Sequence, residues 1–447
     1  MSKFTKSRES VDTSLLLWQE NPTQIAIEET YDVMVHPVSS IFNEGSINFD
    51  LPPQPKGMLS NVEVVTTFTV KNAGNNLESA DQVSIVNNIG SAIWGLVDVK
   101  IDDRISLMQS MQNAYAYQTF FNNVLNHDST HEKFLYANEL FLMDSGTSKN
   151  DSESLVFGAG EDDVIKNLGA AQRSKRIKTS KSITTFTKLH CSLLTTHKAL
   201  PTSMKIRVSL TKNSDKFLLL ARDGSDYRIN IQTLHLVATY HKPRDVVLKT
   251  MENKLKSSPA IYNVTRPEII VRPIVQTSRV IRVNDLFHDK LPKYAFFCIQ
   301  GSQDFDGSFS KNPFAFIPFR KFQFYVNGTP YFVEPLEITP RISGSFNIYD
   351  ENAAYLRQLY KTIGKDLRGD CLINQDNFQL NFIVGLSLTS DRCNTLSNHL
   401  NLQENASTHL EIDMGDERLP IDPILVIYAL FDRQIEISFE RTIHVVE

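Results

Sequence analysis

The sequence predicts an all-β fold, a double jelly roll made of two tandem eight-stranded antiparallel β-sandwich lobes with short inserted helices. Three observations lead to this prediction. Short segments that alternate apolar and polar residues recur along most of the chain. The 27 Phe and 14 Tyr, against 2 Trp, favour pleated and half-buried surfaces. The order of segments in the first half also recurs in the second, and 447 residues are too many for one ordinary core.

The chain divides into four expected parts. An N-terminal arm covers residues 1–40, the first jelly roll 41–243, a linker 244–262 and the second jelly roll 263–447. The arm is polar apart from a short apolar patch at residues 15–18, and the linker is polar with moderate helical character. Because so few apolar groups cannot offset the entropy of ordering, we expect the arm to order only on assembly.

In the first half, one helix is expected at residues 113–125, where Tyr117, Phe120, Phe121 and Val124 recur at spacings of three and four. Residues 145–181 are rich in Gly, Ser, Asp and Asn and are interpreted as a loop. Strands are predicted at 46–51, 61–71, 97–101, 184–194, 204–210 and 229–240, where apolar and β-branched residues alternate with polar ones.

In the second half, Asn327-Gly328 is the strongest hairpin signal, because both residues accept a positive φ. A second helix is predicted at 352–363. Strands are expected at 269–272, 280–283, 294–299, 322–326, 378–388, 409–414, 424–430 and 435–445. The strand at 97–101 precedes the first helix as the strand at 322–326 precedes the second, and this repetition indicates an internal duplication.

Composition and charge exclude several classes of protein. A net charge of −5 argues against a sequence-independent nucleic-acid binder, and no specific nucleic-acid site is evident. The longest apolar stretch, at residues 424–431, is far shorter than a membrane span, and the first residues lack the apolar core of a secretory signal. We therefore expect a chain made in the host cytosol, without membrane insertion. Its four cysteines, Cys191, Cys298, Cys371 and Cys393, are expected to be reduced.

No catalytic, cofactor-binding or metal-binding residue is predicted, and the chain is interpreted as a non-enzyme. A P-loop and a G-x-S-x-G elbow are absent, and Leu135 stands where a zincin needs its second His. No strand offers the H-x-H of a metal-dependent cupin. His127 and His131, with Asp128, stand at the spacing of a metal pair, but a solvated turn after the helix is the favoured interpretation.

Two further motifs are weighed against plain surface roles. Arg368-Gly369-Asp370 spells an integrin-type tripeptide and is interpreted as a coincidence in a surface loop. A basic run could face a packaged genome or serve as an import signal, but a solvated loop is the preferred interpretation. The run consists of Arg173, Lys175, Arg176, Lys178 and Lys181.

A series of short motifs along nearly the whole chain carries a family resemblance. In chain order they are Asn-Pro-Thr at 21–23, Val-His-Pro-Val-Ser-Ser at 35–40, Leu-His-Cys-Ser-Leu at 189–193, Ile-Arg-Val-Ser-Leu-Thr-Lys-Asn at 206–213 with Phe217, Asp-Leu-Phe at 285–287, Leu-Pro-Lys at 291–293, Gly-Ser-Phe-Ser-Lys-Asn-Pro-Phe at 307–314, Phe-Tyr-Val-Asn-Gly at 324–328, and the tail from Leu410 to Arg441. With these motifs the chain resembles the major capsid proteins of Polinton (Maverick) elements and adintoviruses, which have a double jelly roll similar to that of the adenovirus hexon.

The resemblance implies a structural role in a virion. Three chains would form a homotrimeric, pseudo-hexameric capsomer that tiles an icosahedral shell. Its partners would be neighbouring capsomers and penton or minor capsid proteins, and the arm would tie the capsomer to the shell or to a neighbouring trimer. The loops 145–181 and 391–408 are candidates for the outer surface.

The two predicted helices occupy matching positions in the two lobes, so we expect them near lobe–lobe contacts. Phe120, Phe121, Leu359 and Tyr360 are the candidate subunit-contact residues. The alternative is that these side chains belong to the core of a single lobe. For the whole chain, the alternatives are a jelly-roll carbohydrate-binding protein, a metal-dependent cupin-like enzyme and a minor structural virion protein.

Overall fold

The computed structural model describes residues 23–38, 45–102, 105–144, 167–287, 290–338, 353–366, 369–375, 377–378, 380–390, 392, 400–401, 405–415 and 419–446. Several predictions therefore lie outside the described residues. These are residues 1–22 of the arm, residues 145–166 of the long loop, most of the loop 391–408, and the residues Arg368 and Cys393.

The first lobe is a sandwich of two antiparallel sheets. One sheet has the order β1 (Ile27–Val35), β11 (Tyr227–Pro243), β3 (Met58–Asn72), and both β4 (Asn75–Asn76) and β8 (Ile183–Lys188) pair with β3. The other has the order β2 (Ser46–Leu51), β9 (Ile206–Lys212), β6 (Trp94–Ile101), β7 (Ile105–Ser106). The short strands β5 (Ser84–Ile85) and β10 (Leu219–Leu220) pair with each other.

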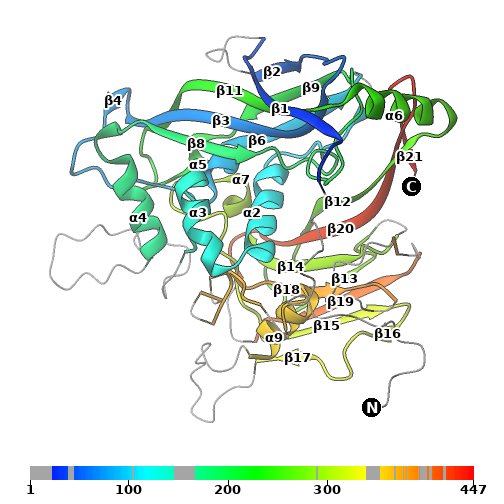
Figure 1. The fold of residues 1–447 in the computed structure, drawn as a ribbon. Helices are drawn as coiled ribbons and strands as arrows, with labels where there is room; N and C mark the ends of the chain where they lie inside the picture. Colours follow the sequence, from blue (N-terminus) through cyan, green and yellow to red (C-terminus); the bar gives the residue numbers. More distant parts are fainter. Residues whose placement is uncertain are drawn as a thin grey trace, which may run out of the picture.

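The second lobe is also a sandwich of two antiparallel sheets. The first contains β12 (Ala260–Pro273), β20 (Pro423–Ile437), β14 (Tyr294–Gly301) and β18 (Val384–Ser387) in that order, and β21 (Ile443–Val446) pairs with β20. The second contains β13 (Val280–Asn284), β19 (Thr408–Asp413), β15 (Lys321–Val326) and β16 (Thr329–Pro330), and β17 (Leu336–Glu337) pairs with β15. Figure 1 shows most of this lobe, green through yellow to red, below the first, while β12 and β20 extend up towards α6.

The strand order confirms the double jelly roll. The path β1-β11-β3-β8 of the first lobe corresponds strand by strand to β12-β20-β14-β18 of the second. The path β2-β9-β6-β7 corresponds in the same way to β13-β19-β15-β16. Because equivalent strands appear in the same chain order in both lobes, the topology supports the internal duplication inferred from the sequence. The domain limits predicted from the sequence stay a prediction.

Helices connect the strands and cover one end of the first lobe. They are α1 (Ile89–Ala92), α2 (Ala114–Asn126), α3 (Ser129–Glu139), α4 (Leu168–Ile177) followed by a 3-10 turn at Lys178–Ser180, α5 (Asp215–Leu218), α6 (Asp245–Ser257), α7 (Ser302–Asp306) and α9 (Ala353–Thr362). The predicted helices at 113–125 and 352–363 are confirmed as α2 and α9. Each comes after the strand pair β6–β7 or β15–β16 and before β8 or β18, so the two helices are topologically equivalent.

The structure differs from the sequence prediction at both ends of the first lobe. Residues 27–35, assigned to the arm, form β1, which pairs along the end of β11 and places Tyr31 opposite Tyr240. Only Val35 of β1 is buried, so the strand has little of the apolar alternation that identifies a half-buried strand. Its Glu28, Glu29 and Asp32 suit an edge strand, where charges discourage pairing with other chains.

The interpretation of residues 145–181 as a loop is wrong for its second part. Residues 168–177 form α4, whose first turn is capped by Asn167, because the Asn167 side chain accepts a hydrogen bond from the Ala170 N–H at 3.0 Å. In the segment predicted as the linker, residues 245–257 form α6, and β12 begins at Ala260. Of the described residues in the strand predicted at 378–388, Val384–Ser387 form a strand, β18.

The hairpin predicted at Asn327-Gly328 is present between β15 and β16. Asn327 has φ 50° and Gly328 has φ 76°, the left-handed pair that a two-residue type I′ turn requires. Val326 and Thr329 close the turn as a strand pair. A Cβ added at Gly328 would meet no atom within 4 Å, so only the backbone conformation restricts this position.

We predict that Gly328→Ala lowers the free energy of unfolding by about 1–2 kcal/mol, the cost of a left-handed conformation for a residue with a Cβ. Thermal unfolding followed by circular dichroism measures the change. The exposed neighbour Thr329→Ala serves as the control and should leave the transition almost unchanged. Equal effects of the two substitutions would contradict the strain assigned to Gly328.

Candidate functional site

The junction between the two lobes is the most elaborate contact surface among the described residues. Figure 1 places α2 between the strands of the first lobe and β14 and β20 of the second. Every residue of α2 from Ala114 to Val124 except Asn122 is buried, as is Leu125. One continuous core of buried apolar residues runs through both lobes, so the chain folds around a shared interior.

Aromatic rings from α2 stack on rings of the second lobe. Phe120 lies parallel to Phe314 with ring centroids 4.5 Å apart. Phe121 stacks on Tyr428 of β20 at 5.0 Å and on Phe316 at 5.8 Å. Such pairs add about 0.5–1.5 kcal/mol each beyond the burial of their area. The spacing that predicted the helix from sequence is thus the spacing that points these rings at the second lobe.

Tyr117 fixes the register of the junction through its ring and its hydroxyl group. The ring stacks on Phe305 with centroids 4.7 Å apart. The hydroxyl group donates to the Pro313 carbonyl at 2.8 Å and accepts from the Gln300 amide at 2.8 Å. Burial raises the pKa of the Tyr117 hydroxyl well above its ordinary value, so it remains a protonated donor.

The lobes also approach each other through backbone. Gly307, at φ 100°, lies so near α5 that an added Cβ would stand 2.6 Å from the Cα atom of Phe217. The Ala221 N–H donates to the Phe309 carbonyl at 2.7 Å across the same contact. Only glycine combines this φ with this clearance. The Gly-Ser-Phe-Ser-Lys-Asn-Pro-Phe motif at 307–314 is therefore a junction segment, a role that the sequence alone did not reveal.

The four candidate subunit-contact residues lie in different surroundings. Phe120 and Phe121 are 0% exposed at the lobe junction, and Leu359 is 0% exposed in the second lobe. Tyr360 is half-buried, and its hydroxyl group donates to the Ile373 carbonyl at 2.9 Å. Within one chain, three of the four side chains are thus enclosed, and a contact of any of the four with another subunit stays a prediction.

A buried ion pair supports the junction from the side of α4. Arg173 is 0% exposed and lies 2.6 Å from the Asp144 carboxylate, which is 3% exposed. The guanidinium group also donates to the carbonyl groups of Ile85 and Leu142. The second carboxylate oxygen of Asp144 accepts from the Asn312 amide of the second lobe at 2.9 Å. The pair therefore joins α4 to both lobes.

This ion pair corrects the interpretation of the basic run as a solvated loop. Arg173 belongs to the interior, because it neutralises a buried carboxylate. The other four members of the run, Lys175, Arg176, Lys178 and Lys181, are exposed on α4 and the turn after it. The guanidinium group of Arg176 lies over the Tyr136 ring, 5.4 Å from its centroid.

Several polar and titratable groups, among them Glu139, His190 and His127, lie near the C-terminal half of α2. The Glu139 carboxylate accepts from the Asn123 amide at 3.3 Å, and burial raises the pKa of Glu139 to about 7. Burial also lowers the pKa of His190 to about 4. The pKa of His127 is lowered to about 4 by burial and by the nearby His131, whose ring stacks on it at 4.4 Å. Both histidines are therefore neutral at pH 7.

The polar groups considered as possible binding sites are mostly engaged within the chain. The Asp370 side chain accepts hydrogen bonds from the Ser129 hydroxyl group and from the Cys371 N–H, and the Ser129 bond lowers the pKa of Asp370. Among the described residues, no three His, Cys, Asp or Glu side chains form a group suited to a metal ion. Cys191, Cys298 and Cys371 are free and buried.

Among the described residues, no helix is both long enough and apolar enough to cross a membrane.

Comparison with known proteins gives matches among solved structures only. No family model matches the chain, and no curated protein sequence matches it. The chain superimposes on a chain of the Sputnik virophage with a TM-score of 0.60 at 10% identity, covering 98% of this chain and 93% of that one. For the mavirus major capsid protein the TM-score is 0.54 at 10% identity, covering 100% and 96%. For the Faustovirus major capsid protein it is 0.57 at 8% identity, covering 95% and 93%.

These structural neighbours are double jelly-roll capsid proteins of viruses, and they share the fold over nearly their whole length. Identities of 8–10% carry the fold and no residue-level correspondence.

We predict that Arg173→Met lowers the free energy of unfolding by about 3–5 kcal/mol, because it leaves the Asp144 carboxylate buried without a counter-charge. The double variant Arg173→Met/Asp144→Asn should recover part of the loss, since it removes the unpaired charge. Denaturant unfolding measures both. Lys175→Met on the exposed side of α4 is the matched control, and a loss of stability no larger than in this control would contradict the prediction.

We also predict that Glu139→Gln stabilises the protein in a pH-dependent manner. The folded chain keeps the Glu139 proton up to about pH 7, whereas the unfolded chain loses it near pH 4.5. The native protein therefore loses stability as pH rises through this window, by about 3 kcal/mol at most. A glutamine carries no such penalty.

The measurement is the difference in Tm between Glu139→Gln and the parent protein from pH 4.5 to 8. The difference should be small at the acidic end, grow up to about pH 7 and then level off. The histidines titrate in both proteins, so their contribution cancels in the difference. A difference that does not change with pH would exclude a buried, titrating Glu139.

Proposed function

We propose that this chain is a viral major capsid protein with a structural rather than a catalytic role. The observation that carries the proposal is the fold itself: two topologically equivalent jelly rolls on one chain, joined through a shared buried core. Solved proteins that superimpose on this chain over nearly its whole length, with TM-scores of 0.54 and 0.57, are the major capsid proteins of mavirus and Faustovirus.

The two-lobed shape suggests how copies would associate. Three chains around a threefold axis present six similar lobes, so we propose a homotrimeric capsomer with a pseudo-hexagonal outline that tiles an icosahedral shell. The lobe junction supports this arrangement, because a rigid pair of lobes keeps the angle between neighbouring lobes constant. The subunit contacts of such a trimer should bury more than about 2,000 Å² in total, as permanent interfaces do.

The finer assignment is to the capsid proteins of Polinton (Maverick) elements and adintoviruses. Its support is the series of sequence motifs, several of which occupy structural positions: residues 206–213 include β9, residues 307–314 line the junction, and residues 324–328 lead into the hairpin turn. We propose the virion as its location, and neighbouring capsomers and penton or minor capsid proteins as its partners.

The burial of the four candidate subunit-contact residues within one chain indicates which of them remains accessible to a neighbouring subunit. Phe120, Phe121 and Leu359 are enclosed within the single chain, so they would act by holding the lobes in shape. Tyr360 on α9 is half-buried and keeps surface for a neighbour. We propose that subunits approach the exposed side of α9 around Tyr360.

The test is the native mass of the purified protein together with negative-stain images. We expect three times the mass of one chain and particles with a hexagonal outline. A stable monomer at micromolar concentration, or an oligomer without threefold symmetry, would overturn the proposal.

A further inference from the structure

The linker helix α6 is the only helix of ten or more residues in the described part of the chain that has no buried residue. It is amphipathic, with Val247, Leu248, Met251 and Leu255 along one side. Charged groups hold the helix near both ends, with Asp245 2.9 Å from Lys56 and Glu252 2.6 Å from Arg441. Val247, Leu248 and Leu255 are only partly buried and Met251 is 40% exposed. An apolar helix face that is covered only in part indicates a surface that another segment covers.

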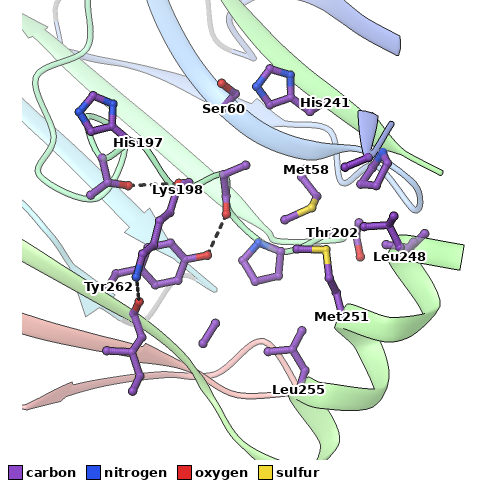
Figure 2. A pocket seen from close by; sticks show the side chains of 18 of the residues that line it. Met58, Ser60, His197, Lys198, Thr202, His241, Leu248, Met251, Leu255 and Tyr262 are labelled. Carbon is purple, nitrogen blue, oxygen red and sulfur yellow. Dashed lines mark hydrogen bonds between the residues drawn. The ribbon is translucent and has the colours of Figure 1, made fainter. Parts of the chain in front are cut away.

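That face borders an open groove of about 1,100 Å³. Figure 2 shows Leu248, Met251 and Leu255 of α6 on one side of this groove and Met58 and Tyr262 across from them. The volume lies at the upper end of the range of about 300–1,000 Å³ that is typical of small-molecule sites, and a short peptide segment fits within it. We call this space, bounded by α6, the start of β3, the loop before β9 and the start of β12, the α6 groove.

Hydrogen bonds between the two lobes hold the floor of the groove in place. Across its floor, the Tyr262 hydroxyl group donates to the Ala199 carbonyl at 2.9 Å, and the Lys198 ammonium group donates to the Ile261 carbonyl at 2.8 Å. These bonds tie the second lobe to the loop of the first and keep the floor in place while α6 forms the wall. The groove is therefore a fixed feature between linker and lobe.

Among the first residues that the structure describes, two lie at the edge of the α6 groove. Ala26 and Ile27 line it, and the Ala26 carbonyl accepts from the N–H of Arg244, the residue that precedes α6. Residues 23–25 are exposed and do not line the groove, and the structure does not describe residues 1–22. Their single apolar patch is Leu-Leu-Leu-Trp at 15–18.

Reach and charge both fit this segment to the groove. From Thr23, the first described residue, the five residues back to Trp18 span at most about 17–18 Å, and α6, with 13 residues, is about 20 Å long. The connecting chain is thus comparable in length with the helix. Asp12 and Glu20 flank the patch in the sequence. The groove is lined by three lysines, at positions 188, 198 and 254, and by one carboxylate, Glu252, which is paired with Arg441.

We propose that residues 15–18 bind in the α6 groove of their own chain and cover the apolar face of α6. The N-terminal segment thereby braces the linker against the first lobe. This inference does not depend on the proposed capsid function, because it concerns one chain and its own groove.

Disulfide trapping in the full chain tests the proposal. The variant pairs Leu16→Cys with Met251→Cys, and Cys393→Ser is present throughout. The native Cys191, Cys298 and Cys371 are buried, and burial raises the pKa of each, so they react slowly. After mild oxidation, we expect a peptide linking residues 16 and 251 in the monomer band of a non-reducing gel.

The matched control pairs Leu16→Cys with Asn253→Cys, since Asn253 is exposed on α6 and does not line the groove. Trapping at 251 that is no greater than at 253 would overturn the proposal. Links that join two chains would also overturn it, because they would assign the groove to a neighbouring copy.

Tryptophan fluorescence gives an independent test that leaves the fold intact. The chain has 2 Trp, and Trp94 is buried at 1% exposure, so subtracting the spectrum of Trp18→Phe isolates the emission of Trp18. We expect blue-shifted Trp18 emission that moves to the red in Leu255→Lys and stays in place in Asn253→Lys. A water-like Trp18 emission that Leu255→Lys does not change would overturn the proposal.

Discussion

The contact between α2 and the second lobe is the constraint on which the rest of the structure depends. A jelly roll can bury its own core, so two of them on one chain have no need to touch beyond their linker. Here Tyr117, Phe120 and Phe121 belong to neither core alone, and their rings lie against rings from the other lobe. Protein interiors are packed densely and resist gradual deformation, so this contact gives the lobes one defined orientation.

Polar groups add specificity to a contact that apolar burial stabilises. A purely apolar junction could slide, since dispersion and the hydrophobic effect have little directional preference. The Tyr117 hydroxyl group, the Asn113 amide and the Arg173–Asp144 pair each reach a defined partner across or beside the junction. A shifted arrangement would leave these groups buried without partners, at a cost of about 1–3 kcal/mol for each neutral group. The hydrogen bonds therefore specify how the two lobes are positioned relative to each other, and the stacked aromatic rings stabilise that arrangement.

Local patterns in the sequence were sufficient for much of this fold, but partners distant in the chain were not predictable. The spacing of Tyr117, Phe120 and Phe121 predicted α2, and Asn327-Gly328 predicted its turn, because both signals arise within a few residues. The edge strand β1 was missed because its side chains are mostly exposed. Arg173 was assigned to the surface because its carboxylate partner lies in another segment, and no periodicity reveals a buried ion pair. The double jelly roll was predicted from the repetition between the two halves, which is a global signal, whereas the strand order comes from the structure.

The two equivalent helices have diverged in a way that limits how lobes can be joined. α2 presents its rings to the second lobe, whereas Tyr355 of α9 donates to the Arg320 and Leu336 carbonyl groups within its own lobe. The interface is heterologous, since each lobe contributes a different surface to it. α9 carries two aromatic residues, the buried Tyr355 and the half-buried Tyr360, so it has no counterpart of the three rings that α2 presents. The same position in the duplicated fold therefore serves two purposes: α2 joins one lobe to the other, and α9 completes the packing of its own lobe.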